Sequence, residues 1–447
     1  MPEIAVGSQV FGVVFHPKRP IVYTGLLDGR IKAFSYNEQG APQPIFSLRP
    51  SKRSCRGLSL NDDGSKLYTV GKAKALNIID TTTQSIDTRS GAHDSTINCV
   101  KSLMPWMVAT GDDDGTVKLW DPRQRDVAKT YTQHFDFISD FLWLPDKKQL
   151  VATSGDGTLS VMDIRSKKPE PIAHSEDQED ELLSIVAIKG SSKILVGTQI
   201  GVISIFNRNK GWADCVDRIP GHPLSVDALC NVPMGVPGVD ADSTVLTGSS
   251  DGFVRAVQIL PTKLVGVVAD HGEFPVERIA VGEGVGQAED TESEATPHDT
   301  RIKPSVDDDL DAKMEDDFSR EKKWWVGSVG HDESLRMTDL EGFFRETAAG
   351  SNATLDARSD DEDSDVGEGL SGEEGADGPS VGVGEDGDES SDESEDDEAM
   401  EEDEAEWESE DEKPKAQKRK RAEKDSIGNS KRGKKEEVID KGFFDGL

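Results

Sequence analysis

Short apolar runs rich in β-branched residues recur along the chain from the N-terminus to about residue 345, and polar turn residues separate them. Examples are KLYTV, MVAT, KILVG and STVLTG, and each run is followed by the turn of a repeated unit. Runs of this length are typical of β-strands, since amphipathic helices need longer segments. Short strands at even spacing with regular turn signals predict an all-β fold.

The turns belong to a sequence repeat with a regular period. Segments that align with DGTVKLWD begin at Asp28, Asp114, Asp156, Asp251 and Asp332, and weaker copies begin at Ala73 and Ile200. The ends of successive units are separated by 45, 41, 42, 44, 51 and 81 positions. A period of about 40 to 45 residues is the length of a four-stranded propeller blade. Seven units therefore predict a seven-bladed β-propeller over residues 1–345.

The units resemble WD repeats, because Gly221-His222 and Trp120-Asp121 match the two dipeptides that mark this repeat. In WD repeats the aspartate at the position of Asp114 bonds a histidine, a serine or threonine, and the tryptophan of one blade. The resemblance therefore assigns a structural network to the third unit, formed by His93, Thr110, Asp114 and Trp120. It implies the same role for four further aspartates, Asp28, Asp156, Asp251 and Asp332.

The segment GDDDG from Gly111 could instead form a metal-binding loop. A calcium loop of the EF-hand type needs oxygen ligands at alternate positions, framed by helices. Here Asp112, Asp113 and Asp114 are adjacent and a strand pattern follows. Adjacent strand residues point to opposite faces, so the three carboxylates cannot all reach one ion. We interpret Asp112 and Asp113 as turn residues, and we expect no metal or cofactor.

The last blade is interrupted by an acidic insert, which accounts for the 81-residue gap. Residues 281–320 contain 13 acids and 4 bases and lie between VERIAV and WWVGSVGHD. We interpret them as a long surface loop, because insertions in repeat proteins fall in loops. Two segments compete to close the ring, Ile4 to Val6 and EGFFRET from Glu341, and the sequence leaves this choice open.

The formal net charge of −36 is concentrated in the C-terminal quarter of the chain. Residues 1–280 carry 33 acids and 30 bases, whereas residues 360–412 carry 28 acids and no lysine or arginine. Such blocks of like charge predict a disordered acidic tail, here 346–412. An acid stands three positions after several serines, a context that acid-directed kinases favour: Ser359, Ser371, Ser390, Ser394 and Ser409.

A basic segment, 413–435, follows the acidic tail and carries 11 bases against 2 acids. Its two clusters resemble a bipartite nuclear import signal, and direct RNA contact is the alternative. The clusters consist of Lys418, Arg419, Lys420, Arg421, Lys431, Arg432, Lys434 and Lys435. The chain then ends in a short apolar segment, 436–447, with Phe443, Phe444 and Leu447. Apolar side chains in a polar tail indicate docking on a partner groove.

Nothing in the sequence indicates catalysis. No H-E-x-x-H or G-x-x-x-x-G-K-[ST] motif is present, and most of the eight histidines fall at the repeat landmark. The four cysteines are widely spaced without a C-x-x-C pair, which predicts free thiols in a reducing compartment. We find neither a signal peptide nor an apolar stretch of about 20 residues that could cross a membrane.

Two arginines follow the blade-ending aspartate in consecutive units, in Trp120-Asp121-Pro122-Arg123 and Met162-Asp163-Ile164-Arg165. This spacing resembles the WDxR box of WD-repeat substrate receptors, which dock on the adaptor of cullin-4 ubiquitin ligases. Two guanidiniums on one rim could bind acidic partner groups, but local ion pairing is the alternative. The loop RPSKRSCR, 49–56, could meet RNA phosphate or acidic protein, or it could simply be solvated.

The propeller, the acidic insert, the tail and the GFFDGL ending together resemble the fungal Jip-type WD-repeat proteins, related to animal WD repeat-containing protein 55. The N-terminal VFGVVFHPKRPIVYTGLLDGRIKAFSY is especially similar. The resemblance implies nucleolar residence and a role in ribosomal RNA production or pre-ribosome assembly. We expect a non-enzymatic nuclear and nucleolar scaffold, a monomer within larger assemblies with pre-ribosomal partners. The alternatives are a ubiquitin-ligase receptor and an acidic chaperone for histones or ribosomal proteins.

Overall fold

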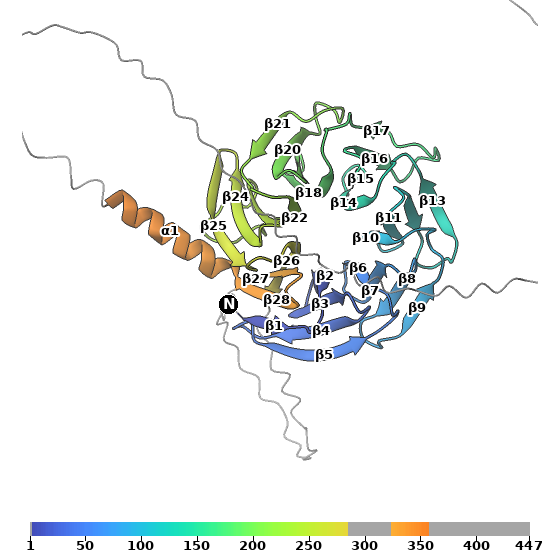
Figure 1. The fold of residues 1–447 in the computed structure, drawn as a ribbon, viewed down its shortest axis with the longest axis horizontal. Helices are drawn as coiled ribbons and strands as arrows, with labels where there is room; N and C mark the ends of the chain where they lie inside the picture. Colours follow the sequence, from blue (N-terminus) through green and yellow to red (C-terminus); the bar gives the residue numbers. More distant parts are fainter. Residues whose placement is uncertain (1, 285–322, 357–447) are drawn as a thin grey trace, which may run out of the picture. The chain divides into compact units, whose positions relative to one another are not determined.

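The computed structural model describes residues 2–284 and 323–356, with side chains described as far as Ala348. Within these ranges the chain forms seven four-stranded antiparallel sheets and one helix. The sheets are arranged as blades in a ring around a central channel (Figure 1). The predicted seven-bladed all-β propeller is therefore confirmed.

The first four blades follow the chain without interruption. The first contains β2 (Val10–Phe15), β3 (Ile21–Leu26), β4 (Ile31–Tyr36) and β5 (Pro42–Leu48), and the second contains β6 (Cys55–Leu60), β7 (Lys66–Gly71), β8 (Leu76–Asp80) and β9 (Ile86–Arg89). The third contains β10 (Ile97–Met104), β11 (Met107–Asp112), β12 (Val117–Trp120) and β13 (Val127–Tyr131), and the fourth contains β14 (Ile138–Leu144), β15 (Gln149–Ser154), β16 (Leu159–Asp163) and β17 (Ala173–His174).

The last three blades include the strand that closes the ring. The fifth contains β18 (Leu182–Ile188), β19 (Lys193–Thr198), β20 (Val202–Asn207) and β21 (Asp217–Pro220), and the sixth contains β22 (Val226–Asn231), β23 (Thr244–Ser249), β24 (Phe253–Ile259) and β25 (Thr262–Asp270). The seventh contains β26 (Val276–Gly284), β27 (Lys323–Gly330), β28 (Ser334–Asp339) and the N-terminal β1 (Glu3–Ala5).

Two loop faces follow from the antiparallel order of each blade. The turn between the second and third strands lies at the same end as the loop that leads into the next blade, because strand direction reverses at every step. We call this side the turn face, because it carries the Asp-Gly turns. The connections between first and second strands, and between third and fourth strands, lie on the opposite face.

The Asp-Gly turns require glycine for a conformational and a packing reason. Gly115 has a φ of 76°, in the left-handed region that side chains disfavour. A Cβ atom there would also lie 2.6 Å from the carbonyl oxygen of His134, in the loop that leads into the fourth blade. Each inter-blade loop can therefore sit directly on the preceding turn, which fixes neighbouring blades against each other.

The N-terminal strand closes the ring. Ile4 of β1 pairs with Leu335 of β28 and is buried in the core between the seventh and first blades. The competing segment EGFFRET lies instead in helix α1 (Leu340–Asp356), whose first turn is capped by the Asp339 carboxylate accepting the Gly342 amide at 3.1 Å. Leu340 and Phe344 face the core four positions apart, a helical rather than a strand spacing.

Two predicted boundaries need correction. The predicted boundary between residues 345 and 346 falls inside α1, which continues to Asp356, so the tail does not begin at 346. Phe343 and Phe344 pack against the sixth blade and anchor this helix. The insert does not begin at 281, because residues 281–284 are the last ladder positions of β26 opposite β27. Most of the insert, and the segments 357–412, 413–435 and 436–447, lie outside the described residues.

Candidate interaction faces

The third blade contains a buried network of four polar side chains. His93 Nδ1 lies 2.7 Å from Asp112 Oδ2, and its Nε2 lies 2.7 Å from Thr110 Oγ1. Trp120 donates its indole N–H to the same Thr110 hydroxyl at 2.8 Å. All four residues are buried, so the network ties the loop before β10 to β11 and β12.

The predicted aspartate of this network was wrong: Asp112 takes the role assigned to Asp114. Asp112 ends β11 with 2% exposure, and its Oδ1 also accepts the amides of Asp114 and Thr116. Asp114 is exposed at the tip of the turn. Burial tends to raise the pKa of Asp112, but the His93 hydrogen bond, the backbone amides and the His93 charge outweigh it and lower this pKa. Alignment on Asp-Gly cannot reveal which of three adjacent carboxylates turns inward.

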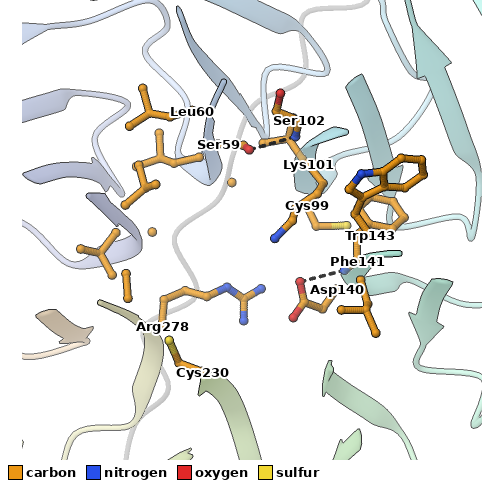
Figure 2. A pocket seen from close by; sticks show the side chains of 18 of the residues that line it. Ser59, Leu60, Cys99, Lys101, Ser102, Asp140, Phe141, Trp143, Cys230 and Arg278 are labelled. Atoms are coloured by element: carbon orange, nitrogen blue, oxygen red, sulfur yellow. Dashed lines mark hydrogen bonds between the residues drawn. The ribbon is translucent and has the colours of Figure 1, made fainter. Parts of the chain in front are cut away.

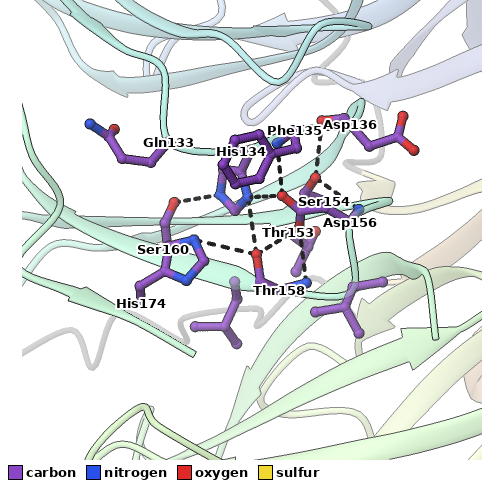
Figure 3. Close-up of polar contacts among 12 residues, drawn as sticks. Gln133, His134, Phe135, Asp136, Thr153, Ser154, Asp156, Thr158, Ser160 and His174 are labelled. Carbon is purple, nitrogen blue, oxygen red and sulfur yellow. Dashed lines mark hydrogen bonds and ion pairs between the residues drawn. The ribbon is translucent and has the colours of Figure 1, made fainter. Parts of the chain in front are cut away.

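The fourth and seventh blades hold related networks at the predicted aspartates. His134 bonds Asp156 at 3.0 Å and Ser160 at 2.7 Å (Figure 3). His271 bonds Asp332 at 2.8 Å and Ser328 at 2.8 Å. The hydroxyl partner in the fourth blade comes from the third strand instead of the second, an exchange that the repeat pattern did not reveal.

The first and sixth blades depart from the assigned role. Asp251 forms a bidentate ion pair with Arg255, at 3.0 and 2.7 Å. It does not bond His222, which instead bonds Thr247 at 2.9 Å. Asp28 accepts the Arg30 amide at the rim of its turn and reaches no histidine. Among the residues described, no group of three histidine, cysteine or acidic side chains could hold a metal ion. The aspartates of the repeat thus serve packing and turn geometry.

The inner strands enclose a channel cavity of about 710 Å³. Figure 2 shows Lys101, Asp140 and Arg278 pointing into it from the third, fourth and seventh blades. Arg278 donates to the carbonyl oxygens of Asp227 at 3.2 Å and Ser139 at 3.3 Å, and so links the seventh blade to the sixth and fourth across the channel. The alternating pattern of β26 gave no signal for this cross-channel contact.

A second cavity of about 390 Å³ opens near the ends of the inner strands that meet the turn face. Its wall combines apolar side chains with charged groups of both signs. The apolar ones include Phe11, Phe137 and Leu183, the carboxylates are Asp113, Asp227 and Glu277, and the guanidiniums are Arg56 and Arg278. Burial raises the pKa of Asp227, and the hydroxyls of two nearby serines donate to the same carboxylate oxygen. We call this cavity the recess.

Arg123 and Arg165 occupy equivalent places on the opposite face, each after the third strand of its blade. The Arg123 guanidinium bonds both carboxylate oxygens of Asp121, at 2.9 and 2.7 Å, while its side chain remains 69% exposed. This hydrogen bond lowers the pKa of Asp121 to about 2. Arg165 makes the same pair with Asp163. Both arginines are thus held in one orientation by local pairing and remain accessible.

The basic loop 49–56 lies on the turn face, between the first two blades. Its last member, Arg56, belongs to β6, and its guanidinium turns inward to bond Asn98 at 2.6 Å and Asp113 at 3.4 Å. Arg49 donates to the Asp28 carbonyl oxygen at 2.9 Å. Lys52 and Arg53 complete the basic group of this loop.

The remaining predicted site residues lie outside the described residues. They are the import clusters Lys418 to Arg421 and Lys431 to Lys435, the five tail serines from Ser359 to Ser409, and the docking residues Phe443, Phe444 and Leu447. In the part of the chain that the structure covers, no helix has the length and apolarity to span a membrane. The four cysteines are free thiols, with Cys55 and Cys99 buried.

Seven four-stranded blades, three of which hold a histidine–aspartate–hydroxyl network, define a WD-repeat β-propeller, a class of proteins that generally act as non-enzymatic scaffolds for other proteins. The chain belongs to the WDR55 family, whose match covers residues 1–286. The resemblance inferred from the sequence is therefore confirmed.

Relatives in this family come from fungi, an animal, a plant and Dictyostelium. WD repeat-containing protein JIP5 of Coprinopsis cinerea is 61% identical over 455 residues, covering 100% of both chains. WD repeat-containing protein 55 of Bos taurus is 35% identical over 324 residues, covering 72% of this chain and 80% of the relative. The homologue of WD repeat-containing protein 55 in Dictyostelium discoideum is 33% identical over 345 residues, covering 77% and 72%.

Proposed function

We propose that this protein is a non-enzymatic nucleolar scaffold in ribosome biogenesis. The observation that carries the proposal is the use of the repeat histidines. In the third, fourth and seventh blades the histidine is buried, and its two ring nitrogens bond an aspartate and a hydroxyl. These histidines therefore stabilise the blade. The loops on the two faces of the rigid propeller are then available for function, and such loops are suited to binding other proteins.

The nucleolar setting rests on sequence features that accompany the ring. The acidic block 360–412 followed by the basic block 413–435 is an order typical of nucleolar proteins. Resemblance to the Jip-type proteins supports a role in ribosomal RNA production or pre-ribosome assembly. Pre-ribosomal factors and basic proteins are the expected partners, and direct RNA contact stays a prediction.

Cellular depletion tests this function directly. We expect a fluorescent fusion of the full chain to concentrate in the nucleolus, and depletion to cause ribosomal RNA precursors to accumulate severalfold on northern blots. Re-expression of the full chain should restore normal precursor levels. A cytoplasmic fusion together with unchanged precursors would refute the proposal.

Docking on a ubiquitin-ligase adaptor is a second candidate, favoured by the equivalent exposed placement of Arg123 and Arg165 on adjacent blades. Charge reversal of both, R123E with R165E, is expected to lower adaptor co-purification about tenfold, because the partner's acidic groups would meet repulsion. R125E is the matched control, since Arg125 lies in the same loop with its side chain 83% exposed. If wild-type protein brings down no adaptor, this candidate is eliminated.

A chaperone role for the acidic tail is the third alternative from the sequence. It depends on residues 360–412, which lie outside the described residues. It therefore stays a prediction.

A further inference from the structure

The turn face carries large apolar side chains that the fold does not need for its core. Phe135 is 93% exposed, Ile200 68%, Leu224 51% and Phe274 49%. We call these four residues the apolar arc. Exposed apolar groups that recur on one face of a soluble protein mark an interaction surface.

The four residues follow one another around half of the ring. Phe135 lies in the loop leading into the fourth blade, Ile200 in the turn of the fifth, and Leu224 and Phe274 in the loops leading into the sixth and seventh. Ile200 and Leu224 belong to neighbouring segments, because a Cβ on Gly201 would lie 2.6 Å from the Leu224 carbonyl oxygen. The recess opens toward the same face and adds Phe11, Phe137 and Leu183.

Hydrogen bonds fix the backbone at two members of the apolar arc, Phe135 and Ile200. The Phe135 amide donates to the Asp156 carboxylate at 3.0 Å, within the fourth-blade network. The Ile200 amide donates to Asp180 at 3.1 Å. These side chains are therefore displayed from fixed positions, which lowers the entropic cost of ordering them when a partner binds.

The charge of this half of the face has one sign. Loops and turns of the fourth to seventh blades on the turn face contain 11 acids and no lysine or arginine; they span 132–137, 155–158, 175–181, 199–201, 221–225, 250–252, 271–275 and 331–333. The corresponding segments 27–30, 49–54 and 72–75 of the first two blades contain six bases and one acid. The loops of the turn face are thus basic at the first two blades and acidic at the fourth to seventh.

The strongest negative charge lies between members of the apolar arc. The loop 176–181, with sequence EDQEDE, separates Phe135 from Ile200 and Leu224 along the ring. Asp177 and Asp180 accept hydrogen bonds from amides within or next to this loop, which fixes its shape. The side chains of Glu176, Glu179 and Glu181 are not used in this way and remain exposed.

We propose that the apolar arc and the loop 176–181 bind an extended segment of a partner protein that combines lysines or arginines with large apolar side chains. The apolar residues of the segment pack on the arc and into the recess, and its cations face the glutamates. A nucleic acid is disfavoured there, since its phosphates would meet the exposed carboxylates of the loop 176–181. This inference deepens the scaffold function proposed above and rests on it.

Peptide binding to the full-length protein tests the inference. The probe is a fluorescein-labelled peptide, Gly-Lys-Arg-Leu-Lys-Phe-Arg-Lys-Gly, followed by anisotropy at physiological salt. One companion peptide has serine in place of leucine and phenylalanine, and another has glutamate in place of every base. We expect the probe to bind about tenfold more tightly than the serine companion, and the acidic companion not to bind.

Three variants locate the binding surface. F135A with L224A should reduce the affinity for the probe about tenfold and remove its preference over the serine companion. E176Q with E179Q and E181Q should weaken binding severalfold and flatten its salt dependence. W106A with M234A is the matched control, because both residues are exposed apolar groups on the opposite face, at 48% and 70%. All three variants should melt at the wild-type temperature, since they change exposed side chains.

Every outcome bears on the proposal. The proposal is overturned if the wild type binds the probe and the serine companion equally well. It is also overturned if the arc and glutamate variants bind the probe like the wild type, because peptide binding would then be assigned to the acidic tail. A concentration-dependent dimer in sedimentation that F135A with L224A dissolves would assign the arc to a second copy and also overturn it. Failure of the nucleolar function would leave these binding results intact, so the two failures are distinguishable.

Discussion

Replacing Asp112 with alanine is expected to lower the free energy of unfolding by about 3 kcal/mol. The change leaves His93 without its carboxylate partner in a buried place and removes the acceptor for the amides of Asp114 and Thr116. Buried networks that lose one member retain unsatisfied polar groups, which cost more than the lost bond itself. Equilibrium unfolding in urea, followed by tryptophan fluorescence, measures the effect.

Asp114→Ala is the matched control for this prediction. Asp114 stands two positions away in the same turn but is exposed, so its replacement is expected to change stability by less than about 0.5 kcal/mol. Equal losses at the two positions would contradict the geometry. A larger loss at Asp114 would restore the assignment made from the repeat pattern.

The pH dependence of the same pair gives a second readout. The folded pKa of Asp112 lies below its ordinary value of 3.8. Its contribution is therefore complete above that value and is lost as the pH falls through the folded pKa. The stability difference between wild type and D112A should accordingly be constant near neutrality and shrink below about pH 4. A difference that grows on acidification would contradict this linkage.

Ile4→Asp is expected to open the ring and destabilise the protein by about 4 kcal/mol. Ile4 is 5% exposed and packs in the core that joins the seventh and first blades, so the new carboxylate would be buried without a partner. Loss of β1 would also leave β28 as an unpaired edge. Thermal unfolding measures the stability, and hydrogen exchange of the β28 amides reports the lost pairing.

Ala5→Asp provides the comparison on the same strand. Successive strand residues point to opposite sides, and Ala5 is exposed where Ile4 is buried. A5D should change stability by less than about 0.5 kcal/mol and leave the β28 amides protected. If I4D melted like A5D and kept its exchange protection, closure by β1 would be wrong.

The sequence was sufficient for the architecture because the blade is a local unit. Strand runs, the Asp-Gly turns and a period of about 42 residues are all encoded within one repeat, and seven repeats specify the ring. The tryptophan, histidine and threonine of the third-blade network were identified for the same reason, since their spacing follows the strand register. The family was also readable from the N-terminal repeat and the chain ending.

Sequence patterns led to a wrong assignment, or left a choice open, where the outcome depends on contacts between segments. The sequence does not distinguish Asp112 from Asp114 as the partner of His93. The packing of His93 onto the hairpin selects Asp112, whose side chain turns inward. EGFFRET has enough apolar residues for a strand, but it forms a helix. Asp339 caps the N-terminus of this helix, and Phe344 is buried against the sixth blade. Asp251 prefers the cation of Arg255 over His222.

The sequence by itself determined the number of blades, the turn chemistry, the separation of charge along the chain and the family. Only the tertiary structure decided which aspartate is buried, which strand closes the ring, and which exposed residues share a face. The reason is that the repeat pattern is enforced within about 40 residues by backbone hydrogen bonding and strand alternation. The apolar arc and the loop 176–181 come from four different blades, and they share one face because strand direction reverses at every step and the blades pack side by side.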